Sequence, residues 1–147
     1  MDRTIEKFQF SGSLYIWKYV DDQSHYPGWN ITGDNDGCDS LIELLEIMDK
    51  SDYPSRKSIK TVPVTANQVK VANGGRYKAT ESLKLDYKRY GQIEWKTSET
   101  KDGLLIEFNK DKIKELKTSI QKIKKGNGDF AVSDSLDDNV LYFWWNP

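Results

Sequence analysis

The alternation of apolar and polar residues predicts an amphipathic helix in the first third of the chain. Ser40 and Glu43 have the Ser-x-x-Glu spacing of a capping box, in which two side chains accept hydrogen bonds from backbone N–H groups at the start of a helix. The apolar residues that follow recur at spacings of three and four, which places them on one side of a helix. They are Leu41, Leu44, Leu45 and Met48. The pattern therefore predicts a helix over about residues 39–50.

A second helix is predicted over about residues 110–125. Asn109 precedes it and is a favourable N-cap residue, and Gly126 follows it as a typical end signal. The apolar residues again recur at spacings of three and four, and lysines cover most of the remaining surface. These apolar residues are Ile113, Leu116, Ile120 and Ile123.

Most other segments alternate between apolar and polar residues with the period of two that is typical of strands. Such segments cover residues 4–20, with an interruption at residues 11–13, and residues 29–32, 58–64, 83–87, 92–97 and 104–108. The last two have the spacing of a hairpin, and the turn signal at residues 73–75 predicts another hairpin between residues 69–71 and 77–79. Residues 140–145 read VLYFWW, which is apolar on both faces. We therefore expect this segment to be a central strand of a sheet or to be covered by a partner.

The elements follow the order strands, helix, strands, helix, strand, which is not a regular alternation of strands and helices. We therefore predict an α+β fold, in which a mostly antiparallel sheet is packed by the two helices. A length of 147 residues is that of one globular domain over residues 1–147. The single cysteine excludes an internal disulfide, and no apolar run approaches the roughly 20 residues that span a membrane. The charged first residues differ from a signal peptide, so we expect a cytosolic protein.

The net charge is −1, but it is distributed unevenly along the chain. Residues 21–52 contain nine acidic residues and one basic residue, a local charge of −8. Residues 53–125 carry a local charge of +10, and the last 22 residues carry −4. Such asymmetry attracts charged partners when it survives folding, although segments of opposite charge can also come to lie side by side.

The acidic turn at residues 34–37 fails the test for a calcium-binding loop. With Gly37 at the sixth position of an EF-hand loop, the first position would be Thr32 and the eighth Asp39, where an acid and an apolar residue are expected. A zinc site needs more histidine and cysteine than the one of each that the chain contains. We therefore predict no metal and no cofactor.

A small hydrolase with an acid or Cys–His site is one alternative. Cys38 lies near a helix start, which lowers the pKa of a thiol, and His25 lies upstream. However, Asp34, Asp36 and Asp39 surround the thiol and raise its pKa again. No pair of carboxylates stands out as catalytic, so we predict no catalytic residues.

Nucleic-acid binding through the basic residues 53–125 is another alternative. Aromatic side chains stack on bases when they share one exposed face of a sheet. The candidates for this role are Tyr77, Tyr87, Tyr90 and Trp95. Against this alternative, the chain has no RNP1-like motif and is slightly acidic as a whole.

Protein binding is the function that these patterns favour. A loop with aromatic residues and the acidic turn flank one short predicted strand, and aromatic residues are enriched at interfaces. The candidate partner-binding residues are Tyr26, Trp29, Asp34, Asp36, Asp39 and Glu43. An acidic surface of this kind fits a basic protein. The specific hypothesis is an immunity-type inhibitor that neutralises a basic, nuclease-like toxin.

Overall fold

The computed structural model describes residues 3–19, 28–51, 53–65, 77–126 and 130–146 of the chain. In chain order, its elements are α1 (Arg3–Lys7), β1 (Leu14–Tyr19), β2 (Trp29–Gly33), α2 (Asn35–Lys50), β3 (Ser55–Lys60), β4 (Tyr77–Ala79), β5 (Ser82–Tyr87), β6 (Trp95–Glu99), β7 (Gly103–Phe108), α4 (Lys110–Lys124), β8 (Phe130–Val132) and β9 (Leu141–Phe143).

The strands form two sheets. Sheet A has the strand order β4-β1-β2-β9-β8, and sheet B has the order β3-β5-β7-β6. Neighbouring strands are antiparallel except for two parallel pairs, β2 with β9 and β5 with β7. The predicted α+β fold is therefore confirmed, with two sheets in place of the one expected. Strands β4, β1 and β2 pair with one another apart from sheet B, and β9 extends this sheet by pairing with β2 after the chain has completed sheet B.

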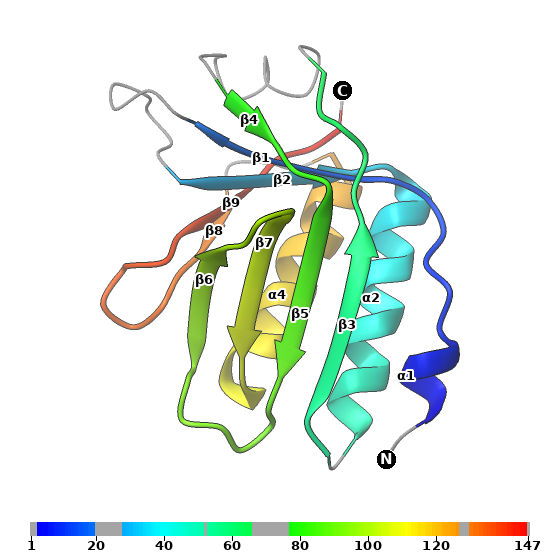
Figure 1. The fold of residues 1–147 in the computed structure, drawn as a ribbon, viewed down its shortest axis with the longest axis vertical. Coiled ribbons are helices and arrows are strands. Elements are labelled where there is room, and N and C mark those ends of the chain that lie inside the picture. Colours follow the sequence, from blue (N-terminus) through cyan, green and yellow to red (C-terminus); the bar gives the residue numbers. More distant parts are fainter. Residues whose placement is uncertain (1–2, 20–27, 52, 66–76, 127–129, 147) are drawn as a thin grey trace.

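Helices α2 and α4 run antiparallel, side by side, behind sheet B (Figure 1). Their apolar sides and the inner faces of both sheets form the main core. The predicted helical positions are all buried: Leu41, Leu44, Leu45 and Met48 of α2, and Ile113, Leu116, Ile120 and Ile123 of α4. A fully buried leucine contributes about 2 kcal/mol relative to an exposed one, so these two helices are held mainly by packing.

Two predicted β elements are also confirmed. The hairpin in the middle of the chain consists of β6 and β7, which pair antiparallel. The C-terminal segment contains β9, which lies between β2 and β8 inside sheet A. Just after β9, the indole N–H of the buried Trp144 donates a hydrogen bond of 2.8 Å to the side chain of the buried Asn30.

The first long helix begins earlier than predicted. It starts at Asn35, and its N-cap is Asp34, whose Oδ1 accepts hydrogen bonds from the backbone N–H of Gly37 (2.7 Å) and of Ser13 (2.9 Å). The predicted capping box is therefore wrong. Ser40 is buried one turn inside the helix, where its hydroxyl accepts a hydrogen bond of 3.1 Å from the backbone N–H of Ser11. The acidic turn of the sequence analysis is the first turn of α2.

The strand predicted over residues 4–20 is wrong in its first half, where α1 and an irregular segment precede β1. Within that segment, Gly12 has a positive φ of 83°. A Cβ atom on Gly12 would lie 2.1 Å from the backbone nitrogen of Gly37. The segment therefore packs backbone against backbone on the first turn of α2, and only glycine allows this approach.

The double role of Asp34 gives a first prediction. Asp34→Ala removes the helix cap and leaves the N–H of Ser13 without its acceptor, so the free energy of unfolding should fall by about 2 kcal/mol. The control is Asp36→Ala, which changes an exposed carboxylate in the same helical turn. Urea denaturation followed by circular dichroism measures both variants. Equal stabilities of the two variants would contradict the role given to Asp34.

Candidate protein-binding surface

The predicted partner-binding residues do not form one compact patch. Trp29 opens β2 and is only 5% exposed, because its ring belongs to the main core. Asp34 follows the far end of the same strand, and five strand residues span about 16 Å. Tyr26 lies outside the described residues. The aromatic and acidic groups that the sequence placed beside a short strand are therefore at opposite ends of it.

The acidic residues at the start of α2 differ in their surroundings. Asp34 caps the helix, and Asp39 accepts a hydrogen bond of 2.5 Å from the ammonium group of Lys124 on α4. This hydrogen bond raises the pKa of Lys124. Asp36 and Glu43 have exposed side chains.

The antiparallel packing of the two long helices explains why the acidic segment is not an isolated acidic patch. It brings the acidic start of α2 beside the lysine-rich end of α4 (Figure 1). Charges that are separated by sequence therefore partly compensate each other in the fold, and the pair of Asp39 with Lys124 is the direct contact.

Cys38 is unsuited to nucleophilic catalysis. Its side chain is buried in the core, and its Sγ donates a weak hydrogen bond of 3.6 Å to the carbonyl of Gly33. Burial raises the pKa of the Cys38 thiol to about 11, and the charges of Asp34 and Asp39 act in the same direction. Thiolate is the nucleophilic form, so the folded protein holds this thiol in its unreactive state at neutral pH. His25 lies outside the described residues.

This raised pKa gives a second prediction. A disulfide reagent such as Ellman's reagent should modify Cys38 in the folded protein far more slowly than in urea at pH 8, because both burial and protonation protect the sulfur. The rate in the folded protein should rise as the pH approaches 11. The control is a peptide of residues 34–42 at the same pH. A folded protein that reacts as fast as this peptide would contradict the assignment.

The calcium-loop comparison fails in the structure for a further reason. Residues 35–50 are continuous α-helix, whereas an EF-hand loop must wrap around the ion. Among the described residues, no three His, Cys, Asp or Glu side chains are grouped so that they could hold a metal ion. Within the same residues, no helix combines the length and the apolarity needed to cross a membrane.

The four aromatic residues considered for nucleic-acid stacking do not share a face. Tyr87 and Trp95 are buried in the main core, where each ring packs on Phe108. Tyr77 lies on β4 of sheet A, whereas the exposed Tyr90 follows β5 of sheet B and lies near the ammonium group of Lys110. The stacking platform that the alternative requires is therefore not formed by these residues.

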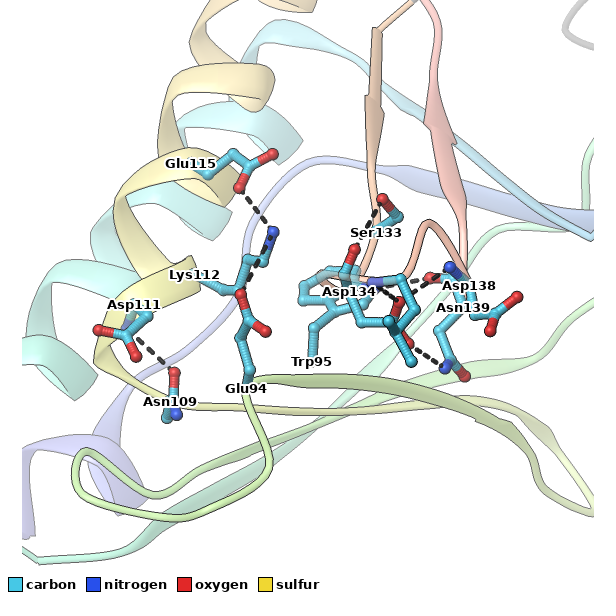
Figure 2. Close-up of polar contacts among 11 residues, drawn as sticks. Glu94, Trp95, Asn109, Asp111, Lys112, Glu115, Ser133, Asp134, Asp138 and Asn139 are labelled. Atoms are coloured by element: carbon cyan, nitrogen blue, oxygen red, sulfur yellow. Dashed lines mark hydrogen bonds and ion pairs between the residues drawn. The ribbon is translucent and has the colours of Figure 1, made fainter.

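The structure reveals a second acidic feature, the loop between β8 and β9, here called the Asp134 loop (residues 133–140). The carboxylate of Asp134 organises it from within (Figure 2). Its Oδ1 accepts hydrogen bonds from the backbone N–H of Leu136 (2.9 Å) and of Asp138 (2.8 Å), and its Oδ2 accepts one from the amide of Asn139 (2.9 Å). These bonds, with the Asn139 amide first, hold the pKa of Asp134 below its usual value.

Asn139 also fastens the Asp134 loop to β6. Its backbone carbonyl accepts a hydrogen bond of 2.6 Å from the indole N–H of Trp95. Its side-chain oxygen accepts one of 3.2 Å from the backbone N–H of Thr97. Asp137 and Asn139 adopt positive φ values of 61° and 57°, which are uncommon for residues with a side chain. The contacts to β6 therefore anchor the C-terminal part of the loop, and the Asp134 carboxylate holds the rest from within.

This loop presents an apolar tip surrounded by carboxylates. Leu136 at the tip is 80% exposed. Figure 2 shows Lys112 between Glu94 (3.8 Å) and Glu115 (3.0 Å), on the side of α4 that faces the loop. We call the acidic loop surface the set of loop residues Asp134, Leu136, Asp137 and Asp138 together with Glu94 and Glu115, which pair with Lys112 on the neighbouring elements. Lys112, whose side chain is 12% exposed, forms ion pairs with Glu94 and Glu115.

Sequence reasoning missed this surface because residues 129–138 have no periodic pattern of apolar residues that would predict a defined structure. Two signals were present: the charge of −4 in the last 22 residues, and a leucine placed between aspartates in the sequence SDSLDDN. Neither signal shows that the loop is ordered, because the anchoring groups come from β6, about 40 residues earlier in the chain.

Comparison with known proteins adds no functional information. No protein-family model matches the chain, and no curated protein matches its sequence with significant similarity.

The hydrogen bonds of Asp134 give a third prediction. Asp134→Ala should increase hydrogen exchange at the amides of Leu136 and Asp138, because both lose their acceptor. The wild-type loop should lose this protection as the pH falls through the lowered pKa of Asp134, since protonation weakens the acceptor. Exchange measured by NMR tests both statements, with Asp137→Ala as the control. Unchanged exchange in the Asp134→Ala variant would show that the loop is held by other contacts.

Proposed function

We propose that this chain is a non-enzymatic cytosolic protein that binds a basic partner protein, as an immunity-type inhibitor binds a nuclease-like toxin. The observation that carries the proposal is the acidic loop surface, where an ordered loop exposes Leu136 among carboxylates. An exposed apolar side chain on an ordered loop suits insertion into an apolar pocket of a partner.

The order of the loop favours binding. Ordering a flexible loop on association costs free energy, and a loop that already has its bound conformation avoids most of that cost. Here Asp134 and Asn139 fix the conformation before any partner arrives. The recognition energy then comes from burial of the leucine tip, and the carboxylates set the orientation and the rate of association.

A nuclease fits the charge of this surface. Proteins that bind the phosphate backbone do so largely through lysine and arginine side chains. A surface of carboxylates can occupy such a site in place of the phosphates. The exposed Asp137 and Asp138 are the groups best placed to do this, because Asp134 is engaged inside the loop.

The other two candidate functions have less support. The hydrolase alternative loses its thiol, because Cys38 is buried and protonated at neutral pH. The nucleic-acid alternative keeps the basic residues of sheet B, but it loses the proposed aromatic platform because Tyr87 and Trp95 are in the core. It is the main competing outcome of the test below.

The test compares two double charge reversals. Asp137→Lys/Asp138→Lys alters the acidic loop surface, and Asp36→Lys/Glu43→Lys changes the net charge equally at the start of α2. The wild-type protein is used to isolate a partner from the native host, and the partner is then purified. Wild type should bind it and inhibit its cleavage of DNA or RNA, and the loop variant should bind at least tenfold more weakly, a loss of about 1.4 kcal/mol.

The control variant separates the two acidic surfaces. If Asp36→Lys/Glu43→Lys loses binding and the loop variant keeps it, the partner docks at the start of α2, and the acidic loop surface is the wrong site. If no basic protein is isolated and the purified chain shifts single-stranded RNA or DNA at low salt, the nucleic-acid alternative replaces the proposal.

A further inference from the structure

A cavity on sheet B is separate from the acidic loop surface. It has a volume of about 320 Å³ and lies where β5 and β7 end, beneath the loop that follows β5. Its walls are mostly apolar, and its lining residues are Asp86, Lys88, Gly91, Gln92, Ile93, Glu107 and Phe108. This volume is at the lower end of the range for sites that bind small ligands or single side chains of a partner.

The cavity opens on the outer face of sheet B. Helices α2 and α4 cover the opposite face, and no described helix or strand lies over the outer face (Figure 1). Residues in the strands alternate between the two faces, so Tyr87 and Phe108 enter the core whereas Asp86 and Glu107 point outwards.

Two carboxylates lie side by side at this point. Asp86 and Glu107 are direct partners in the parallel pairing of β5 with β7. Like charges at directly opposite positions of a sheet destabilise it unless a cation compensates them. One cation is present, because the guanidinium of Arg56 on β3 donates a hydrogen bond of 2.8 Å to Asp86, which is only 4% exposed.

The second carboxylate, Glu107, interacts with the same guanidinium only at longer range and forms no direct ion pair with it. Lys96 is the cross-strand neighbour of Glu107 on β6. Yet among the residues that the structure describes, no cationic nitrogen lies within 4.0 Å of the Glu107 carboxylate. Glu107 is half-buried and lines the cavity. Asp86 therefore has a direct ion pair with Arg56, whereas Glu107 has none among the described residues.

We propose that this cavity binds an arginine side chain, with the guanidinium at Glu107 and the aliphatic stem against the apolar wall at Ile93. A guanidinium is planar and hydrogen-bonds carboxylates in a fixed geometry, and its three-carbon stem suits an apolar wall. The bound guanidinium would compensate the charge of Glu107, as the guanidinium of Arg56 compensates that of Asp86. The exposed Lys88 lies at the rim, where it can contact a carbonyl or carboxylate of the ligand.

Two sources supply this chemistry, namely a residue in a partner protein and the free amino acid. Three probes distinguish them in NMR titrations of the whole wild-type protein: N-acetyl-arginine methylamide, free arginine, and N-acetyl-citrulline methylamide, in which a neutral urea replaces the guanidinium. The first probe should cause saturable shifts at the amides of Gly91, Gln92 and Glu107, and the citrulline probe should not. Shifts with free arginine alone would assign the cavity to the amino acid.

A variant tests the role of the carboxylate. Glu107→Gln keeps the size of the side chain and should weaken binding of the arginine probe at least tenfold, because a hydrogen bond to a charged group is lost. The control is Glu46→Gln on the exposed side of α2. Equal binding of the arginine and citrulline probes to the wild type, or shifts that do not saturate, would overturn the proposal. This result is independent of whether the acidic loop surface binds a basic protein.

Discussion

The carboxylate of Asp34 joins two parts of the molecule whose relative position determines how the rest packs. One of its oxygens holds the first turn of α2 and the segment that leads into β1. Gly12 and Gly37 allow the two backbones to approach closely enough for this contact. Because α2 is set in place at that point, its apolar side meets sheet B, and α4 then packs beside it. The position of α4 in turn fixes where its lysines and acids appear on the surface.

The parts of the fold that depend on local patterns could be predicted from the sequence. The periodic leucines of α2 and isoleucines of α4 identified both helices, and the apolar sequence around β9 identified a central strand. The start of α2 could not be predicted correctly, because Asp34 is stabilised as a cap partly by Ser13, which lies 21 residues away. The division into two sheets depends on pairings such as β2 with β9, which no local pattern encodes.

The candidate sites also depend on residues that are far apart in the sequence, and here the interactions are mostly between charged or polar groups. A local sum of charge identified the start of α2 as acidic, but it could not include Lys124, which lies 85 residues away and pairs with Asp39. For the Asp134 loop, the sequence indicated only a polar stretch. In the structure, hydrogen bonds from Trp95 and Thr97 hold this stretch and give it a defined surface. The row of Arg56, Asp86 and Glu107 is assembled from three strands, so no motif in the sequence indicates it.

The contact between Asn139 and Thr97 also changes what the edge of sheet B exposes. Strand β6 is an edge of sheet B, and the backbone groups of an edge strand are a template on which another chain can add a strand. The side-chain oxygen of Asn139 accepts a hydrogen bond from one of these groups, the backbone N–H of Thr97, so the Asp134 loop lies beside β6 at this point. An added strand could therefore not pair with the N–H of Thr97 while Asn139 holds it. A sequence change at Asn139 that releases the loop would leave the backbone N–H of Thr97 without this acceptor at the edge of the sheet.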